Sequence, residues 1–273
     1  MRTLIRTLPL ILLTGALVSP IAAPAAERLR MATTTSTENS GLLAELNPQF
    51  ESEHGVAVDV IAVGTGKALR IARNCDADIV FVHAPGAEKL FVEAGYGVDR
   101  SPVMHNDFVV LGPPTDPAGV RRAASAAEAL RRIAEAEPSF VSRGDDSGTH
   151  KKEKSLWQQA GIEPEGQWYL AAGQGMGAVL KIADDKQAYT LSDRGTYVAF
   201  QGKTELAVVS EGDPALHNPY HIIAVSPQRC PNARYDLARR YIDYVTGRRG
   251  QKIIGDYRMR GQQLFYPDVI TKP

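Results

Sequence analysis

The sequence has few cysteines, no excess of charge of either sign, and no long apolar run beyond its first 25 residues. Lysine and arginine together number 31, as do aspartate and glutamate, so the formal net charge is zero. A chain without a basic field does not attract the phosphate backbone, which excludes nucleic acid as a partner. Any anion that the protein binds must therefore be held by local geometry and not by global charge.

Metal-ligating side chains are also sparse. The six histidines are scattered, and none forms a ligand-spaced cluster with a cysteine. We therefore expect neither a metal site nor a cofactor. An oxidising compartment would favour a disulfide between Cys75 and Cys230, but their separation in space does not follow from the sequence, so both states stay open.

The first 25 residues have the pattern of a signal peptide. Arg2 and Arg6 precede an apolar run over residues 8–18, and a small-x-small cleavage site ends at Ala25. The run is shorter than the ~20 residues that a membrane-spanning helix needs. No cysteine near the cleavage site offers a lipid anchor. We expect cleavage near Ala25 and an exported, soluble protein.

Apolar runs and helical patterns alternate along the rest of the chain, which predicts an α/β fold. The length of 273 residues leaves room for two domains of roughly 100–200 residues. The Pro-rich segment 112–117 predicts a crossing between the domains, and the strand at 218–226 predicts the return. The main strands are expected at 28–32, 56–63, 78–83, 108–111, 140–142 and 218–226, and the main helices at 42–53, 68–73, 84–94, 126–136, 178–186 and 235–245.

One stretch combines several features of an anion site. Residues 140–142 form the expected strand, Arg143 follows it, and a Gly-rich loop then enters a helix at Thr149. A helix start presents N–H groups without intrahelical partners, and arginine adds a forked, charged donor. Ser147 and Thr149 add hydroxyl donors. The alternative interpretation is an ordinary capped helix beside a surface arginine.

Other strand–loop–helix junctions carry similar groups. Five consecutive hydroxyl residues at 33–37 precede the helix at 42–53, whose expected cap is Asn39 or Ser40. The turn 64–67 opens another helix, but Ile61 and Ala68 exclude a P-loop. The glycines at 173–177 open a third, although they do not match a dinucleotide fingerprint. Loops without a ligand remain the alternative, and we interpret His83, at a strand end, as structural.

Five segments in chain order together resemble the tungstate-binding periplasmic proteins of the TupA type. The resemblance covers nearly the whole mature chain. It implies a type II periplasmic binding protein fold, with two α/β lobes joined by two hinge strands. Lobe I would comprise residues 26–110 and 218–273, and lobe II residues 111–217. The segments are Thr-Thr-Thr-Ser-Thr-x-Asn-Ser-Gly-Leu-Leu at 33–43, Asp-Ala-Asp-Ile-Val-Phe-Val-His-Ala at 76–84, His-Asn-Asp-Phe-Val-Val-Leu-Gly-Pro at 105–113, Ser-Arg-Gly-Asp-Asp-Ser-Gly-Thr-His at 142–150 and Tyr-Thr-Leu-Ser-Asp-Arg-Gly-Thr-Tyr at 189–197.

The resemblance also implies a function. The protein would be a monomeric, periplasmic solute-binding protein without enzyme activity. It would capture tungstate, or also molybdate, for the membrane permease of an ABC importer. The two cysteines are not part of the recognised pattern. The implied ligand-binding residues are Thr34, Thr35, Ser36 and Thr65 from lobe I, and Arg143, Ser147, Gly148, Thr149, the Met176–Gly177 backbone and Thr190 from lobe II.

Hydrogen-bond donors should dominate such a site, because tungstate and molybdate carry no proton at neutral pH. We therefore expect Asp145 and Asp146 to point away or to bind Arg143 or the backbone. Phosphate is the alternative ligand: it is partly protonated, so one of these carboxylates could accept its proton. A serine hydrolase is a second alternative, but no Gly-x-Ser-x-Gly elbow surrounds Ser147. A sensor of anions is a third, and the sequence does not distinguish it from a transport protein.

Overall fold

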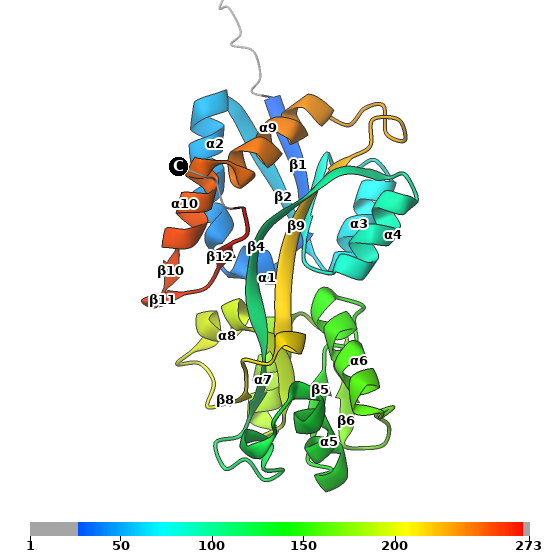
Figure 1. Ribbon diagram of the computed structural model, residues 1–273, viewed down its shortest axis with the longest axis vertical. Coiled ribbons are helices and arrows are strands. Elements are labelled where there is room, and N and C mark those ends of the chain that lie inside the picture. Colours follow the sequence, from blue (N-terminus) through cyan, green and yellow to red (C-terminus); the bar gives the residue numbers. More distant parts are fainter. Residues whose placement is uncertain (1–26, 270–273) are drawn as a thin grey trace, which may run out of the picture.

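Two α/β lobes lie end to end and are joined by two long strands (Figure 1). The computed structural model of the protein describes residues 27–269, so the expected signal peptide lies outside the described residues. Strand β4 (Gly97–Gly112) and strand β9 (His217–Val225) pair antiparallel from Gly97 opposite Val225 to Asp107 opposite His217. The last residues of β4 then pair with two strands of lobe II. Strand β4 therefore belongs to both lobes.

Lobe I is built on the sheet β12-β4-β9-β3-β1-β2. Strands β1 (Glu27–Thr34), β2 (Val56–Val63) and β3 (Ile79–Val82) are parallel to one another. Apolar side chains on both faces form two cores. One core packs under the helices α2 (Leu42–His54), α9 (Tyr235–Thr246) and α10 (Arg248–Asp256), and the other under α3 (Thr65–Arg73) and α4 (Pro85–Glu93).

Lobe II is smaller, and most of its strands have only three or four residues. Strands β7 (Thr190–Asp193) and β8 (Ala207–Ser210) pair with β4, while β5 (Phe140–Ser142) and β6 (Tyr169–Ala171) form a parallel pair. Helices α5 (Ala126–Ala136) and α6 (Gly148–Ala160) cover one core. Helices α7 (Met176–Asp185) and α8 (Arg194–Phe200) lie over the other.

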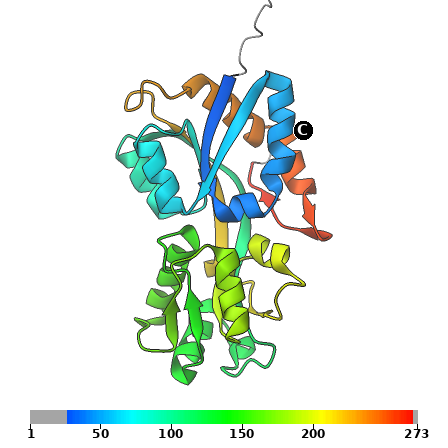
Figure 2. The same cartoon turned by 180° about the vertical axis from the view of Figure 1, so that it is seen from behind.

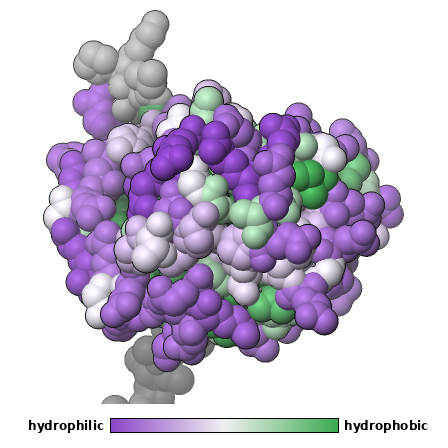
Figure 3. All heavy atoms as spheres, turned by 90° about the horizontal axis from the view of Figure 1, so that it is seen from below, coloured by the Kyte–Doolittle hydropathy of each residue, from purple (hydrophilic) through white to green (hydrophobic). Residues whose placement is uncertain are grey.

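Short elements complete the two lobes. Two 3-10 turns and three two-residue strands lie between the main elements, and none of the helices within residues 27–269 is long and apolar enough to cross a membrane. The face of the molecule seen in Figure 3 is mostly hydrophilic, with only scattered apolar residues. The short elements are η1 (Val120–Arg122), η2 (Pro214–Leu216), β10 (Arg258–Met259), β11 (Gln262–Gln263) and β12 (Tyr266–Pro267).

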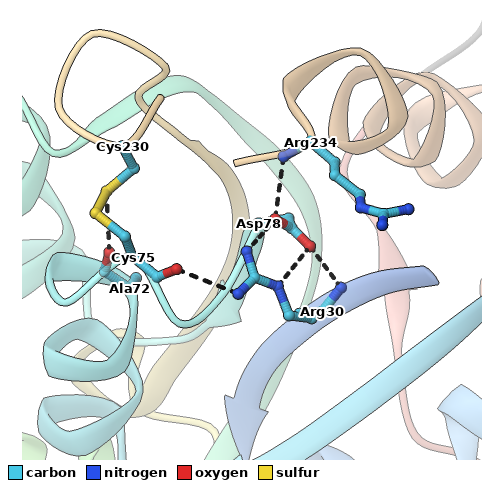
Figure 4. A network of polar contacts seen from close by, with 6 residues as sticks. All are labelled: Arg30, Ala72, Cys75, Asp78, Cys230 and Arg234. Carbon is cyan, nitrogen blue, oxygen red and sulfur yellow. Dashed lines mark hydrogen bonds and ion pairs between the residues drawn. A yellow bond between two sulfur atoms is a disulfide. The ribbon is translucent and has the colours of Figure 1, made fainter. Parts of the chain in front are cut away.

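The two cysteines form a disulfide in lobe I. Cys75, just after α3, is bonded to Cys230, in the loop between β9 and α9, with a Cα–Cα distance of 5.3 Å. Beside it, the fully buried carboxylate of Asp78 accepts hydrogen bonds from Arg30 and from the Arg234 N–H at 3.0 Å (Figure 4). The disulfide and the Arg234 N–H hydrogen bond tie this loop to the α3–β3 turn, and the ion pair with Arg30 ties that turn to β1. This resolves the question that the sequence left open.

Three local differences from the expected elements bear on the site. An additional short helix, α1 (Thr35–Asn39), follows β1 at once and lies at the waist of the molecule, against α8 (Figure 2). The expected cap of α2, Asn39 or Ser40, is wrong, because the N-cap is Gly41, whose φ of 77° favours glycine. Helices α3 and α7 begin at Thr65 and Met176, earlier than expected. Both residues are therefore helix starts, not loop residues.

Candidate anion-binding site

In lobe I, three parallel strands end at one edge of the sheet. Thr34 of β1 lies opposite Val63 of β2, and Thr33 lies opposite Phe81 of β3. The residues that follow these strands are therefore neighbours: the start of α1, the start of α3, and His83. The N-termini of α1 and α3 therefore lie at this edge. A helix start has N–H groups without intrahelical partners, which are available to a ligand.

Lobe II has a matching edge. Ser142 of β5 lies opposite Ala171 of β6, and β5 also makes a parallel bridge to the residue before β7. Arg143 comes directly after β5, and the starts of α6 and α7 follow these strands. Gly144 adopts φ 59°, and a Cβ there would lie 2.9 Å from the Ala171 side chain. Glycine is therefore required for the chain to turn from Arg143 into the loop.

The two edges meet between the lobes. A Cβ on Gly148, at the start of α6, would lie 3.2 Å from Thr65 Oγ1 and 3.2 Å from His83 Cε1. A Cβ on Gly64 would lie 3.6 Å from the Ser147 side chain. The start of α6 from lobe II therefore faces the start of α3 from lobe I. The absence of a side chain at Gly148 lets the two come this close.

Three buried donors at this interface have no protein partner. Among the described residues, the side-chain atoms Thr65 Oγ1, Thr149 Oγ1 and Arg143 Nε are buried without a hydrogen bond. Leaving such a group unpaired costs about 1–3 kcal/mol, so proteins seldom bury one without a reason. Two further atoms of this kind, Asn106 Nδ2 and His221 Nδ1, lie on the hinge strands. A ligand that accepts hydrogen bonds between the lobes would satisfy the first three together.

The neighbouring carboxylates do not face the interface as free acceptors. Asp145 pairs with Arg143 and accepts a hydrogen bond from the Ser147 N–H at 3.2 Å. Asp146 pairs with Lys151 and is well exposed. Its hydrogen bond from Lys151 lowers the pKa of the Asp146 carboxyl below the usual value. The expectation that these carboxylates point away or bind Arg143 or backbone is confirmed for Asp145. Asp146 differs: it pairs with Lys151, and its Oδ2 lies 2.7 Å from where a Cβ on Gly66, at the start of α3, would be.

The remaining predicted residues divide by what their side chains do. Thr34 caps α1 and accepts from the Thr37 N–H at 3.1 Å, and Ser147 caps α6 and accepts from the His150 N–H at 3.2 Å. Thr190 donates its hydroxyl proton to the Val141 carbonyl at 2.7 Å. The Ser147 hydroxyl accepts here and so keeps its proton to donate, whereas the Thr190 proton is already used. Thr35 and Ser36 start α1, and Met176 starts α7 with its side chain buried in the core.

His83, which the sequence predicts to be structural, is buried beside the site. Its Nδ1 lies 2.9 Å from Asn218 Oδ1, its ring stacks on Tyr220 with centroids 4.6 Å apart, and it touches Gly148. Asn218 in turn donates to Asn106 Oδ1 at 2.6 Å. This network connects the site to both hinge strands. The sequence signal was its place directly after a buried parallel strand, at the edge where the other loops begin.

Open space lies next to the site. A cavity of about 620 Å³ separates the lobes and is bordered by His83, Gly148, Lys151, Lys152, His217 and Asn218, among others. Within residues 27–269, no group of three or more histidine, cysteine or acidic side chains could hold a metal ion. The side-chain atoms left without a partner at the interface are hydrogen-bond donors.

Two α/β lobes, two connecting strands and opposed helix starts define the class: a two-lobe solute-binding protein of the type II periplasmic fold. The family described as "PBP superfamily domain" matches residues 19–249. The chain belongs to this superfamily and, within it, to the family of TupA-type tungstate-binding proteins.

Three relatives place the chain in that family. A solved structure described as the tungstate ABC transporter from Geobacter sulfurreducens is 55% identical, with a TM-score of 0.80, over 85% of this chain and 100% of that one. The tungstate-binding protein TupA from Desulfovibrio alaskensis G20 is 47% identical, with a TM-score of 0.77, over 89% and 100%. The tungstate-binding protein TupA of Peptoclostridium acidaminophilum is 44% identical over 87% of this chain and 85% of its own length.

Proposed function

We propose that the protein binds tungstate between its lobes and delivers it to the permease of an ABC importer. The observation that carries this proposal is the group of three buried donors without a partner, contributed by both lobes at the point where the lobes meet. An oxyanion without protons accepts from every one of them. The relatives named for tungstate binding support the choice of ligand.

The proposed shell has three kinds of donor. Thr65 and Thr149 offer free hydroxyls, and Arg143 offers a charged N–H. The starts of α1, α6 and α7 offer backbone N–H groups. Every contact is to an oxygen atom of the ligand, so none of these residues is a ligand of the metal atom itself. The complete proposed set is Thr34, Thr35, Ser36, Thr65, Arg143, Ser147, Gly148, Thr149, Met176, Gly177 and Thr190.

The setting of the protein is part of the proposal. Cleavage near Ala25 would release a periplasmic monomer that docks on a membrane permease. We divide the chain into lobe I, residues 26–110 and 218–273, and lobe II, residues 111–217. The lobes close on the ligand by bending of the hinge strands near residues 105–113 and 218–226.

Phosphate is the ligand that the site disfavours. A partly protonated anion gains from a free carboxylate acceptor. Here Asp145 is engaged by Arg143, and Asp146 is engaged by Lys151. Both carboxylates are already paired with a cation, which disfavours them as acceptors for the proton of a phosphate ion. Molybdate offers the same oxygens and charge as tungstate, so it remains the second candidate ligand.

We propose no catalytic activity. Ser147 caps α6, and its Oγ accepts from a backbone N–H, so nothing at this position activates the hydroxyl for attack. Ester hydrolysis by the protein that disappears in Ser147→Ala would contradict this part of the proposal.

Calorimetric titration with tungstate, molybdate, sulfate and phosphate tests the ligand. We expect tight binding of tungstate, binding of molybdate, and much weaker binding of sulfate and phosphate. Tight binding of phosphate together with no heat from tungstate would overturn the proposal.

A further inference from the structure

The one guanidinium of the proposed anion site is already paired with a carboxylate. Arg143 is 3% exposed, but its positive charge is already paired with Asp145. Two more carboxylates are buried in lobe II: Glu153 accepts from Ser142 Oγ at 2.8 Å, and Asp193 accepts from the Thr196 N–H at 2.8 Å. Neither has a cation within ion-pair distance among the described residues. A dianion bound here therefore lies beside a guanidinium whose charge is already paired, and a further positive charge there would stabilise it.

His83 is a titratable side chain at this interface, and His150, in the first turn of α6, is another. The His83 side chain is 3% exposed. Its ring lies close to Gly148, where a Cβ would be 3.2 Å from His83 Cε1 and also 3.2 Å from Thr65 Oγ1. Its Nδ1 faces Asn218 Oδ1 at 2.9 Å, and the Asn218 amide nitrogen donates to Asn106. Because the Asn218 amide nitrogen faces Asn106, its oxygen faces His83 and accepts a hydrogen bond from the His83 Nδ1–H. That hydrogen bond suits the neutral ring and the imidazolium equally, so a proton adds at Nε2 without breaking it.

Several charged groups surround the His83 ring from different elements. Burial lowers the pKa of His83 below its usual value, and Arg143, after β5, lowers it further. Asp193, at the start of α8, and Glu88, of α4, act in the opposite direction, although Glu88 is itself paired with Arg100. Two lysines and a second histidine, Lys151, Lys152 and His217, border the adjoining cavity. The free protein therefore holds His83 neutral near pH 7, and an added dianion would shift the balance towards the imidazolium.

We propose that His83 is a further residue of the anion site, which takes up one proton from the solvent when the oxyanion binds beside Gly148. This inference rests on the proposed function. The adjoining cavity gives the ring a route to water. The resulting imidazolium keeps its bond to Asn218 and lies over the Tyr220 ring, which favours a cation. Binding is then coupled to pH, and affinity falls as pH rises, by at most about tenfold per pH unit for one proton.

Calorimetry in several buffers measures this coupling. Tungstate is titrated near pH 7 into the wild-type protein in buffers that differ in ionisation enthalpy, and the slope of the observed enthalpy gives the number of protons exchanged. We expect uptake by the wild type of up to one proton per tungstate, and none by His83→Gln. The control His54→Gln alters a histidine in the last turn of α2, and should behave like the wild type. NMR titration of the wild-type His83 ring adds a second readout, in which bound tungstate should raise its pKa.

The outcomes separate the two proposals. Absence of any tungstate heat in the wild type overturns the proposed function. Tungstate binding without proton exchange, or with a His83 pKa that tungstate leaves unchanged, overturns only the role of His83. Uptake that persists in His83→Gln and disappears in Asp145→Asn also overturns it, because the proton would then go to the carboxylate that pairs with Arg143. The NMR titration decides the matter if His83→Gln does not fold.

Discussion

The two lobes contribute different chemistry to one interface. Lobe I offers neutral groups, namely the Thr65 hydroxyl and the start of α1, on a broad sheet with a disulfide behind it. Lobe II offers the charged Arg143, held in a loop that its own ion pair shapes. The buried donors without a partner come from both lobes, so the proposed site requires the two lobes together.

The largest loss of affinity should follow removal of the charge in lobe II. Arg143→Ala deletes the one guanidinium of the proposed shell, and hydrogen bonds to charged groups contribute about 1.5–3 kcal/mol, or roughly 10- to 150-fold in affinity. Calorimetry with tungstate measures the loss. The control Arg121→Ala changes a more exposed arginine of the same lobe. An affinity equal to that of the wild type would exclude Arg143 from the site.

The next effect should come from the contact between the lobes. Gly148→Ala keeps the backbone N–H but places a methyl group 3.2 Å from Thr65 Oγ1 and from His83 Cε1, so one side of the contact must shift by a few tenths of an ångström. Overpacking by one methyl group should cost about 1–2 kcal/mol of binding free energy, which is roughly a 5- to 30-fold loss of affinity. Calorimetric titration with tungstate measures the loss.

The matched control for this change is Gly86→Ala, because a Cβ at Gly86 would meet nothing within 4 Å. It should bind as the wild type does. If Gly148→Ala binds tungstate with the affinity of the wild type, the lobes do not meet at this residue in the tungstate-bound protein.

A smaller effect should distinguish the two free hydroxyls. Thr65→Val in lobe I and Thr149→Val in lobe II each remove one buried donor, which should cost about 0.5–1.5 kcal/mol of binding, or roughly 2- to 12-fold. Without ligand, both variants should be as stable as the wild type or more stable, because neither hydroxyl has a protein partner. Thermal unfolding with and without tungstate tests both statements, and a loss of stability in the free protein would contradict them.

The stability of the two lobes should depend on pH in opposite directions, because each lobe contains a buried carboxylate whose pKa is shifted in a different direction. The affinity for tungstate should change little. Burial raises the pKa of Asp78, but hydrogen bonds from Arg30 outweigh it, so the pKa of the Asp78 carboxyl is lowered, and its stabilising effect is lost as pH falls below about 4. Burial raises the pKa of Glu153 in lobe II, so stability there should fall as pH rises above about 4.5.

Urea unfolding across this pH range measures the difference between the lobes. Both tryptophans, Trp157 and Trp168, lie in lobe II, so their fluorescence reports on that lobe. In Glu153→Gln, the decline above about pH 4.5 should disappear, because the amide does not ionise. A decline of the same size in the variant would assign it to another group.

Much of the fold could be predicted because its elements have strong local patterns. Strand β2, helix α5 and strand β5 lie at the expected residues. The first half of β4 was missed, since Arg100 and Pro102 interrupt its pattern and its register shifts twice against β9. Helix α1 was missed because a run of hydroxyl residues has weak helix propensity; the Thr34 cap and contacts with α8 hold it.

The candidate site was predictable only in outline. Loops rich in donors could be placed at the ends of parallel strands, and the structure brings Thr65, Gly148 and the residues around Arg143 together. The hydroxyl of Thr190 satisfies a backbone carbonyl instead of remaining free. The contact of His83 with Gly148 joins segments far apart in the chain, and no local pattern carries that information.

The sequence by itself determined the alternation of strands and helices and put glycines and hydroxyls at the strand ends, because periodicity and turn chemistry act over a few residues. Only the tertiary structure decided that Cys75 meets Cys230, that Asp145 engages Arg143, and which hydroxyls keep a proton to donate. Those outcomes depend on distances across the sheet and between the lobes. Such distances exist only once the chain has packed.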